Sequence, residues 1–267
     1  MSQKAHRIFI DSVSRDSAEA VSKEEFTRYT FSVSGEGFST DGKHVSLPYD
    51  VRDEVAMCVQ AAIWHEVFGH GTYSDWAVVA GVGYAMPWIH GSLNTFEDMT
   101  VDKRVAERYP QAMLKGEHYA CLLKYAAKKI DKGGGVKAVI KKLDAQDPKC
   151  EMRIQLELLW MAYTRLGCTE GMGDHHPLTD AKVMCFIDAN RPLLERMIDA
   201  AQSKNATTKK NRSLAIKLWE MIHGKPKPPV PPQTPTNWTL EDDEKPEPPE
   251  GGDNPPPPMP QCECGCH

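Results

Sequence analysis

The residues best suited to chemistry in this chain lie in the segment WHEVFGHG, at positions 64–71. His65 and His70 can each offer an imidazole ligand, and Glu66 stands directly beside the first histidine. A catalytic zinc uses three protein ligands and keeps one position open, and a glutamate next to a ligand can act as general base for a water. The segment therefore predicts a Zn²⁺ cofactor held by His65 and His70, with Glu66 as the catalytic base.

The spacing of the two histidines sets a condition on the backbone. They are five residues apart, and on a regular α-helix five residues turn through about 500°, which would leave the two rings about 140° apart. A π-type bulge absorbs one extra residue in a turn and is frequent at functional sites. We therefore expect a π-type bulge or a break around residues 65–70, with Gly69 as the place where the backbone relaxes.

An acidic cluster about thirty positions downstream could complete the metal site. Zinc hydrolases often combine two histidines with one carboxylate, and Glu97 is the first choice for that ligand, with Asp98 as the alternative. Asp102 could hold a histidine ligand in place by contacting the side of the ring that does not bind the metal, or it could serve as an alternative ligand. The competing interpretation is a solvated first helical turn whose negative charges complement the helix dipole.

A second histidine pair lies in the glycine-containing segment GMGDHHPLTD. His175 or His176 could donate a hydrogen bond to the substrate carbonyl in the transition state. The alternative is a polar loop in which Asp174 or Thr179 caps the following helix.

The elements that must position these residues can be predicted from periodicity. Alternation over 26–34 and the run HVSLP indicate a β-hairpin with its turn around Asp41-Gly42. A helical pattern from 50 to about 76 carries the histidine motif, and a second helix is expected over 94–107 because Tyr109-Pro110 ends it. Further helices are predicted over 112–130, 134–144, 149–166, 179–202 and 207–223.

Composition divides the chain into one domain and a tail. Fourteen of the twenty prolines follow Gly224, in a stretch with few apolar residues to bury, so 224–267 is expected to be disordered. Residues 1–223 have ordinary globular composition, and we expect an α+β, mostly helical domain with a small sheet beside the motif helix. The tail ends in Cys262, Cys264, Cys266 and His267, a spacing too tight for a zinc knuckle, which suggests adventitious metal binding or a redox-labile end.

Charge and hydropathy argue against two classes of partner. The formal net charge of −5 gives no indication of nucleic-acid binding, and the small lysine clusters are expected to be solvated helix faces. No apolar run is long enough to span a membrane or to form the core of a signal peptide, so neither membrane association nor secretion is expected, and the expected location is the cytoplasm. The five cysteines before the tail (Cys58, Cys121, Cys150, Cys168 and Cys185) show no motif spacing and are expected to be reduced and buried.

Two resemblances extend these predictions. HEVFGH resembles the HExxGH zinc motif of dipeptidyl peptidase III, a gluzincin group with five-residue histidine spacing whose next helix supplies a glutamate ligand. The ordered series STDGKHVSLP, HEVFGH and NTFEDMTVDKRVAERYP is similar to the N-terminal region of phage and bacterial CobT-like proteins, relatives of a cobaltochelatase subunit. Those proteins usually continue into a von Willebrand factor A domain, whose D-x-S-x-S motif does not occur in these 267 residues.

The resemblances imply two functions. The first is a zincin-like metallopeptidase, with a peptide or protein as substrate, His65, His70 and Glu97 as ligands and Glu66 as base. The second is a non-catalytic, CobT-like metal-binding adaptor that works with an AAA+ ATPase. The presence of Glu66 favours the enzyme, because a binding module needs no base beside its ligand.

Overall fold

The computed structural model describes residues 30–35, 39–40, 44–48, 64–108, 127, 129–169 and 172–224. The elements in chain order are β1 (Thr30–Gly35), β2 (Ser39–Thr40), β3 (His44–Pro48), the π-helix η2 (Trp64–His70), α4 (Gly71–Tyr73), α5 (Trp76–Ala85), the 3₁₀ turn η3 (Pro87–Ile89), α6 (His90–Arg108), α8 (Val136–Gln146), α9 (Glu151–Arg165), α10 (Ala181–Ala201) and α11 (Thr208–His223). The described part is mostly helical, as predicted. Residues 225–267 of the predicted tail and residues 112–126 of the helix predicted over 112–130 lie outside the described residues.

The three short strands pair in the order β1-β3-β2, with β3 in the centre. β2 runs antiparallel to β3, with Thr40 opposite Val45, whereas β1 runs parallel to β3, with Thr30 opposite His44. The prediction that residues 26–34 form the partner arm of a hairpin with HVSLP is therefore wrong. The chain direction in β2 is opposite to that in β1, and the direction in β3 is opposite to that in β2, so β3 and β1 run the same way. The predicted turn at Asp41-Gly42 lies outside the described residues.

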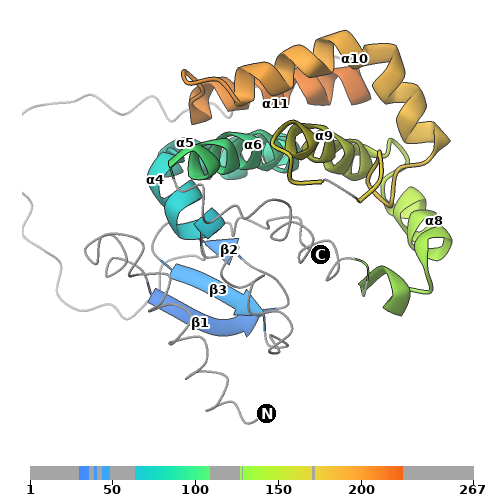
Figure 1. Cartoon of the computed structure of the whole chain (residues 1–267), viewed down its shortest axis with the longest axis horizontal. Helices are drawn as coiled ribbons and strands as arrows, with labels where there is room; N and C mark the ends of the chain where they lie inside the picture. The colour runs from blue at the N-terminus through green and yellow to red at the C-terminus, as the bar shows by residue number, and fades with distance from the viewer. Residues whose placement is uncertain are drawn as a thin grey trace, which may run out of the picture.

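Helix α6 is the centre of the helical part. It contacts η2, α5, α9, α10 and α11, and Figure 1 shows α10 and α11 together on one side of it while the strands lie on the other, beyond η2 and α4. A helix packed on all sides must bury most of its length. The buried residues of α6 are Ser92, Leu93, Thr95, Phe96, Glu97, Asp98, Met99, Thr100, Val101, Asp102 and Val105. The acidic cluster of the sequence is thus inside the protein.

The apolar core joins α6 to the helices that follow. Leu93, Phe96 and Met99 of α6 pack in one cluster with Ile154 and Leu158 of α9 and with further residues of α10 and α11. At about 25 cal/mol per Å² of buried apolar surface, this cluster is a main source of stability for the described part. β2 contacts η2, so the strands lie beside the histidine motif.

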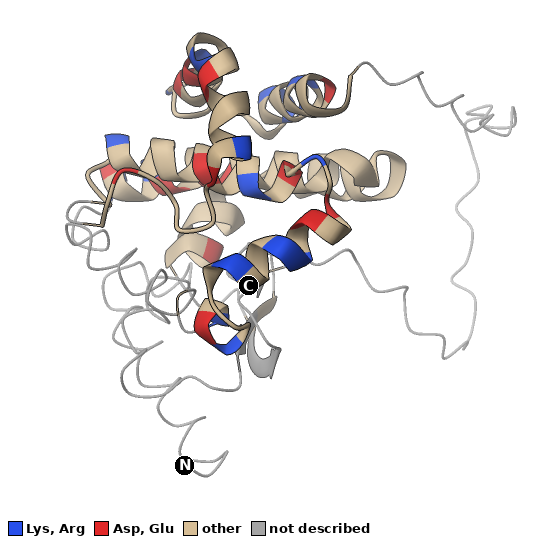
Figure 2. Ribbon diagram, turned by 90° about the vertical axis from the view of Figure 1, so that its right-hand side faces the viewer, with Lys and Arg blue, Asp and Glu red and all other residues tan. Residues whose placement is uncertain are grey.

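The lysines of α8 and two of the three described cysteines have the exposure predicted for them. The lysines of α8, including Lys137, Lys141 and Lys142, are exposed, and Figure 2 shows acidic and basic residues distributed along the same helices. Cys150 and Cys168 are free and buried as expected, but Cys185 is exposed. Within the described ranges, none of the helices combines the length and the apolar character that a membrane crossing requires.

Candidate metal centre

The histidine motif forms a π-helix over Trp64–His70, which confirms the predicted bulge. A π-helix closes its hydrogen bonds between residues five apart, so residues with that spacing lie on the same face. The rings of His65 and His70 accordingly meet edge to face, with centroids 4.7 Å apart and Nε2 atoms 3.1 Å apart.

The π-helix is held against α6 by close packing. Trp64, Val67 and Phe68 are buried, and the backbone at Gly69 lies so near α6 that a Cβ there would be 3.0 Å from the Cβ of Val101. Several described glycines have a positive φ angle, but Gly69 is not one of them. Gly69 lies inside the π-helix, and the structure shows a further reason for a glycine there, the close approach of η2 and α6.

Three ligand atoms converge between η2 and α6. Nε2 of His65, Nε2 of His70 and Oδ1 of Asp98 form a triangle whose sides are 3.1 Å, 3.1 Å and 3.5 Å. Zinc ligands in a tetrahedral site bind at about 2.0–2.1 Å, which places them about 3.3 Å from one another. The triangle therefore fits three ligands of one metal ion with a fourth position left over.

The hydrogen bonds behind the histidines determine which nitrogen carries a proton. Nδ1 of His65 lies 2.7 Å from Oδ1 of Asp102, and because a carboxylate accepts, Nδ1 is the donor. Nδ1 of His70 lies 2.9 Å from Oγ of Ser74, whose hydroxyl proton is donated to Oε2 of Glu97 at 2.6 Å. His70 must therefore donate to Ser74. When both rings are neutral, Nε2 is therefore the nitrogen without a proton in each of them, and its lone pair faces Asp98.

Two ring nitrogens and a carboxylate oxygen this close together repel one another unless a proton or a metal ion lies between them. Burial opposes a charge on His65, but the charges and hydrogen bonds of Asp102 and Asp98 outweigh it and raise the pKa of His65 well above its usual value. Burial also opposes the charge on Asp98, yet its hydrogen bonds with His65 and His70 leave its pKa lowered. The cluster thus attracts a proton strongly, and a metal ion would take the place of that proton.

The structure favours Asp98 over Glu97 as the third ligand. Adjacent residues on a helix point about 100° apart, so α6 cannot direct both carboxylates at the histidines. Asp98 faces them, and its other oxygen accepts a hydrogen bond from Asn94 at 3.1 Å. The oxygens of Glu97 are instead held by three donors, from Ser74, Thr208 and Asn211. The structure thus brings Asp98, the alternative named from the sequence, and not Glu97 to the two histidines, and Asp102 lies in the orienting place predicted for it.

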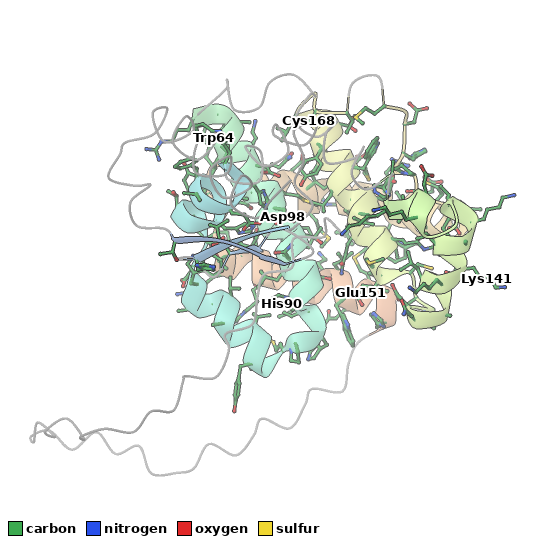
Figure 3. All side chains as sticks on the ribbon, turned by 90° about the horizontal axis from the view of Figure 1, so that it is seen from below. Trp64, His90, Asp98, Lys141, Glu151 and Cys168 are labelled. Atoms are coloured by element: carbon green, nitrogen blue, oxygen red, sulfur yellow. The ribbon has the colours of Figure 1, made fainter. Side chains whose placement is uncertain are left out.

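Most of the site is shielded from solvent. Glu97, Asp98 and Asp102 are 3%, 4% and 1% exposed, which excludes a solvated first turn as the explanation of the acidic cluster. The side chain of His65 is the most open of the three candidate ligands, at 17%, compared with 2% for His70 and 6% for Asp98. Figure 3 shows Asp98 in the interior among the helices, whereas Lys141 projects from α8 at the outer edge.

The second histidine pair belongs to a different network. Oε1 of Glu157, on α9, lies 2.8 Å from Nδ1 of His175, and Oε2 accepts from the backbone N–H of His176. Burial lowers the pKa of His176 to about 4, although Glu157 opposes this effect. The role of these histidines as transition-state donors stays a prediction. The expected caps of the next helix, Asp174 or Thr179, are wrong, since Asp180 caps α10.

Four residues of the site were not predicted. Ser74, Asn94, Thr208 and Asn211 hold the ligands or their partners through side-chain hydrogen bonds. Asn94 could have been found, because it lies one helical turn before Asp98. Thr208 and Asn211 carry no such signal, since they lie more than a hundred positions from Glu97.

Comparison of the chain with protein-family models, curated proteins and solved structures gives no match. The resemblances to dipeptidyl peptidase III and to CobT-like proteins therefore stay predictions from short motifs.

Proposed function

We propose that this protein is a zinc-dependent hydrolase of peptide bonds, with His65, His70 and Asp98 as metal ligands and Glu66 as general base. The observation that carries the proposal is the triangle of three ligand atoms, 3.1–3.5 Å on a side, with Nδ1 of each histidine donating a hydrogen bond on the opposite side of its ring. When bound, zinc would lower the pKa of a water to about 7 and polarise a substrate carbonyl.

The residues around the triangle have separate tasks in this proposal. Asp102 orients the imidazole of His65 by accepting from its Nδ1, which keeps its Nε2 atom available. Glu66 follows His65 in the same π-helix, and its side chain is fully buried. It would take a proton from the attacking water and deliver it to the leaving amine.

A second candidate is a metal-binding adaptor without catalysis, acting with an AAA+ ATPase as the CobT-like resemblance implies. The burial of His70 and Asp98 favours it, because a structural metal needs no route for a substrate. The two candidates share the metal ligands and differ in the task of Glu66.

The proposal is tested on the full chain by metal analysis and by a peptide-library cleavage screen, with and without chelator. We expect one zinc per chain and chelator-sensitive cleavage by the wild type. A variant with Cys262, Cys264 and Cys266 changed to Ser should keep both, which separates the site from the tail cysteines. His65→Ala should lose the metal, and absence of stoichiometric zinc from the wild type would overturn the proposal. Bound zinc without cleavage of any peptide would favour the adaptor.

A further inference from the structure

We propose that Ser74 and Glu97 are positioning residues that orient His70 and hold its ring proton on Nδ1, so that Nε2 is the nitrogen available to a metal ion, and that α11 holds this pair in place. The inference rests on the proposed metal site, but it assigns a task to residues that contact neither the metal nor a substrate in that proposal. It also explains why a carboxylate that is not a ligand is buried beside the ligands.

The first step concerns the single proton of the Ser74 hydroxyl. Its Oγ lies 2.9 Å from Nδ1 of His70 and 2.6 Å from Oε2 of Glu97. The carboxylate can only accept, so the hydroxyl donates to Glu97 and accepts from His70. If Ser74 turned its proton toward His70 instead, Nδ1 would accept it and the ring proton would move to Nε2. A protonated Nε2 cannot bind a metal.

The second step concerns Glu97 itself. Its side chain is buried at 3% exposure, and its two oxygens receive hydrogen bonds from Ser74, Thr208 and Asn211 at 2.6, 3.0 and 2.6 Å. All three partners are neutral donors. Burial of a carboxylate is costly unless such donors satisfy it, so the arrangement fixes Glu97 as an acceptor beside Ser74.

The third step links this acceptor to α11. Thr208 donates to Glu97 and accepts from the backbone N–H of Asp75 at 2.8 Å, next to Ser74 in the chain. Asn211 is completely buried, and its Nδ2 group donates both to Glu97 and, at 2.9 Å, to Oγ1 of Thr100. The start of α11 therefore holds α6 and the segment after η2 in one hydrogen-bonded group. Formation of the His70 side of the site requires that α11 be docked.

The fourth step concerns how much metal affinity should be lost when Ser74 or Glu97 is replaced. Loss of a partner that orients a ligating histidine usually lowers metal affinity about 10- to 100-fold. Asp102 is such a partner for His65 through a direct contact, whereas His70 has the same kind of support through Ser74. We expect the loss of either Ser74 or Glu97 to cost affinity in this range.

The test uses the full-length protein and measures Zn²⁺ affinity by competition with a chromophoric chelator. Ser74→Val and Ser74→Thr have the same shape, and the extended backbone at position 74 accepts both β-branched residues. Only threonine keeps the hydroxyl. Ser74→Val should bind Zn²⁺ about 10- to 100-fold more weakly, and Ser74→Thr should bind close to the wild type. Equal affinities for Ser74→Val and the wild type would overturn the inference.

A second comparison separates positioning from a general loss of stability. Glu97→Gln introduces an amide donor that can face Ser74 and turn its hydroxyl toward His70. Glu157 is the matched control, because it is also buried and also accepts three hydrogen bonds, from His175, His176 and Thr179. Glu97→Gln should weaken Zn²⁺ binding, whereas Glu157→Gln should lower the melting temperature but keep the affinity. An equal loss of affinity in both variants would show that positioning by Glu97 is not the cause.

Substitution with Co²⁺ adds a spectroscopic measurement. The visible d–d bands of Co²⁺ depend on how His70 binds the ion. Ser74→Val should therefore shift these bands, and Ser74→Thr should not. Identical spectra for the two variants would count against the inference even if their affinities differed. A wild type that binds neither Zn²⁺ nor Co²⁺ would overturn the proposed function and this inference together, whereas tight binding unaffected by Ser74→Val would overturn only the inference.

Discussion

Asp98 and Asp102 lie one turn apart on α6 and approach opposite nitrogens of the same His65 ring. Oδ1 of Asp102 is 2.7 Å from Nδ1, and Oδ1 of Asp98 is 3.5 Å from Nε2. Residues four apart share one face of an α-helix. α6 therefore supplies both a candidate ligand, Asp98, and the carboxylate that orients a second candidate ligand, His65. The two aspartates have the same chemistry but different expected effects on metal binding.

The first prediction compares Asp98→Ala with Asp102→Ala. Asp102→Ala should weaken zinc binding about 10- to 100-fold, because His65 stays but is no longer oriented. Asp98→Ala should weaken it further, because a ligand is lost. Both affinities can be measured by chelator competition. A larger loss in Asp102→Ala than in Asp98→Ala would contradict the assignment of the ligand.

The sequence could predict the π-helix because geometry demanded it. Two histidines five residues apart share a face only if the helix takes up an extra residue, and the structure has that conformation over Trp64–His70. The choice between Glu97 and Asp98 could not be made in the same way. Both lie at a suitable distance along the chain, and only the rotation of α6 against η2, set by packing such as Gly69 on Val101, decides which one faces the histidines.

Helix ends were predictable where local chemistry determines them. The helix expected over 207–223 is α11, because Thr207 caps its start and Gly224, with φ 83°, ends it. The direction of β1 was not predictable, since local alternation indicates a strand but not its partner. The contribution of Thr208 and Asn211 to the site also depends on tertiary packing alone.

The second prediction concerns Gly69. A Cβ at this position would lie 3.0 Å from Cβ and 3.1 Å from Cγ2 of Val101, so Gly69→Ala crowds the contact, and Val101 or the two helices η2 and α6 have to move apart slightly. Overpacking of this kind usually costs about 1–3 kcal/mol. Because the candidate ligands come from both helices, zinc affinity should fall together with the melting temperature.

Gly81→Ala is the matched control for this change. Gly81 lies in the middle of α5, and a Cβ there would meet no atom within 4 Å. Alanine is the better helix former by up to about 1 kcal/mol, so this variant should be at least as stable as the wild type and bind zinc equally well. If Gly69→Ala behaved like Gly81→Ala in thermal unfolding, the close approach of η2 and α6 would not be important for stability.

The third prediction is a pH dependence that arises away from the metal site. His176 is buried, its Nδ1 accepts a hydrogen bond from the backbone N–H of Leu178, and its ring packs edge to face on Trp160. Burial lowers its pKa to about 4, whereas an unfolded histidine has a pKa of about 6.5. Between these values the unfolded chain binds more protons than the folded one. The stability contributed by His176 is therefore complete above pH ~6.5 and is lost as the pH falls to about 4.

The size of this effect is on the order of 3 kcal/mol, from the difference between the two pKa values. Denaturant unfolding of the wild type and of His176→Gln between pH 4 and pH 7 measures it. The metal site contributes to both proteins, so it cancels in the difference between them. The free energy of unfolding should fall more steeply with decreasing pH in the wild type, and parallel pH profiles would disprove the role of His176.

The last prediction separates the enzyme from the adaptor through Glu66. In Glu66→Gln the side chain keeps its size, and residue 66 is not among the three converging ligands, so zinc content should be unchanged. Peptide cleavage should fall by a factor of about 10²–10⁴, the usual contribution of a positioned acid–base group. The measurement is the rate of cleavage of a peptide identified in the library screen, with zinc determined on the same samples. His70→Ala is the contrasting variant, since it should lose cleavage and zinc together. Cleavage that persisted in Glu66→Gln at the wild-type rate would exclude Glu66 as the base and leave the metal ligands as the only supported part of the mechanism.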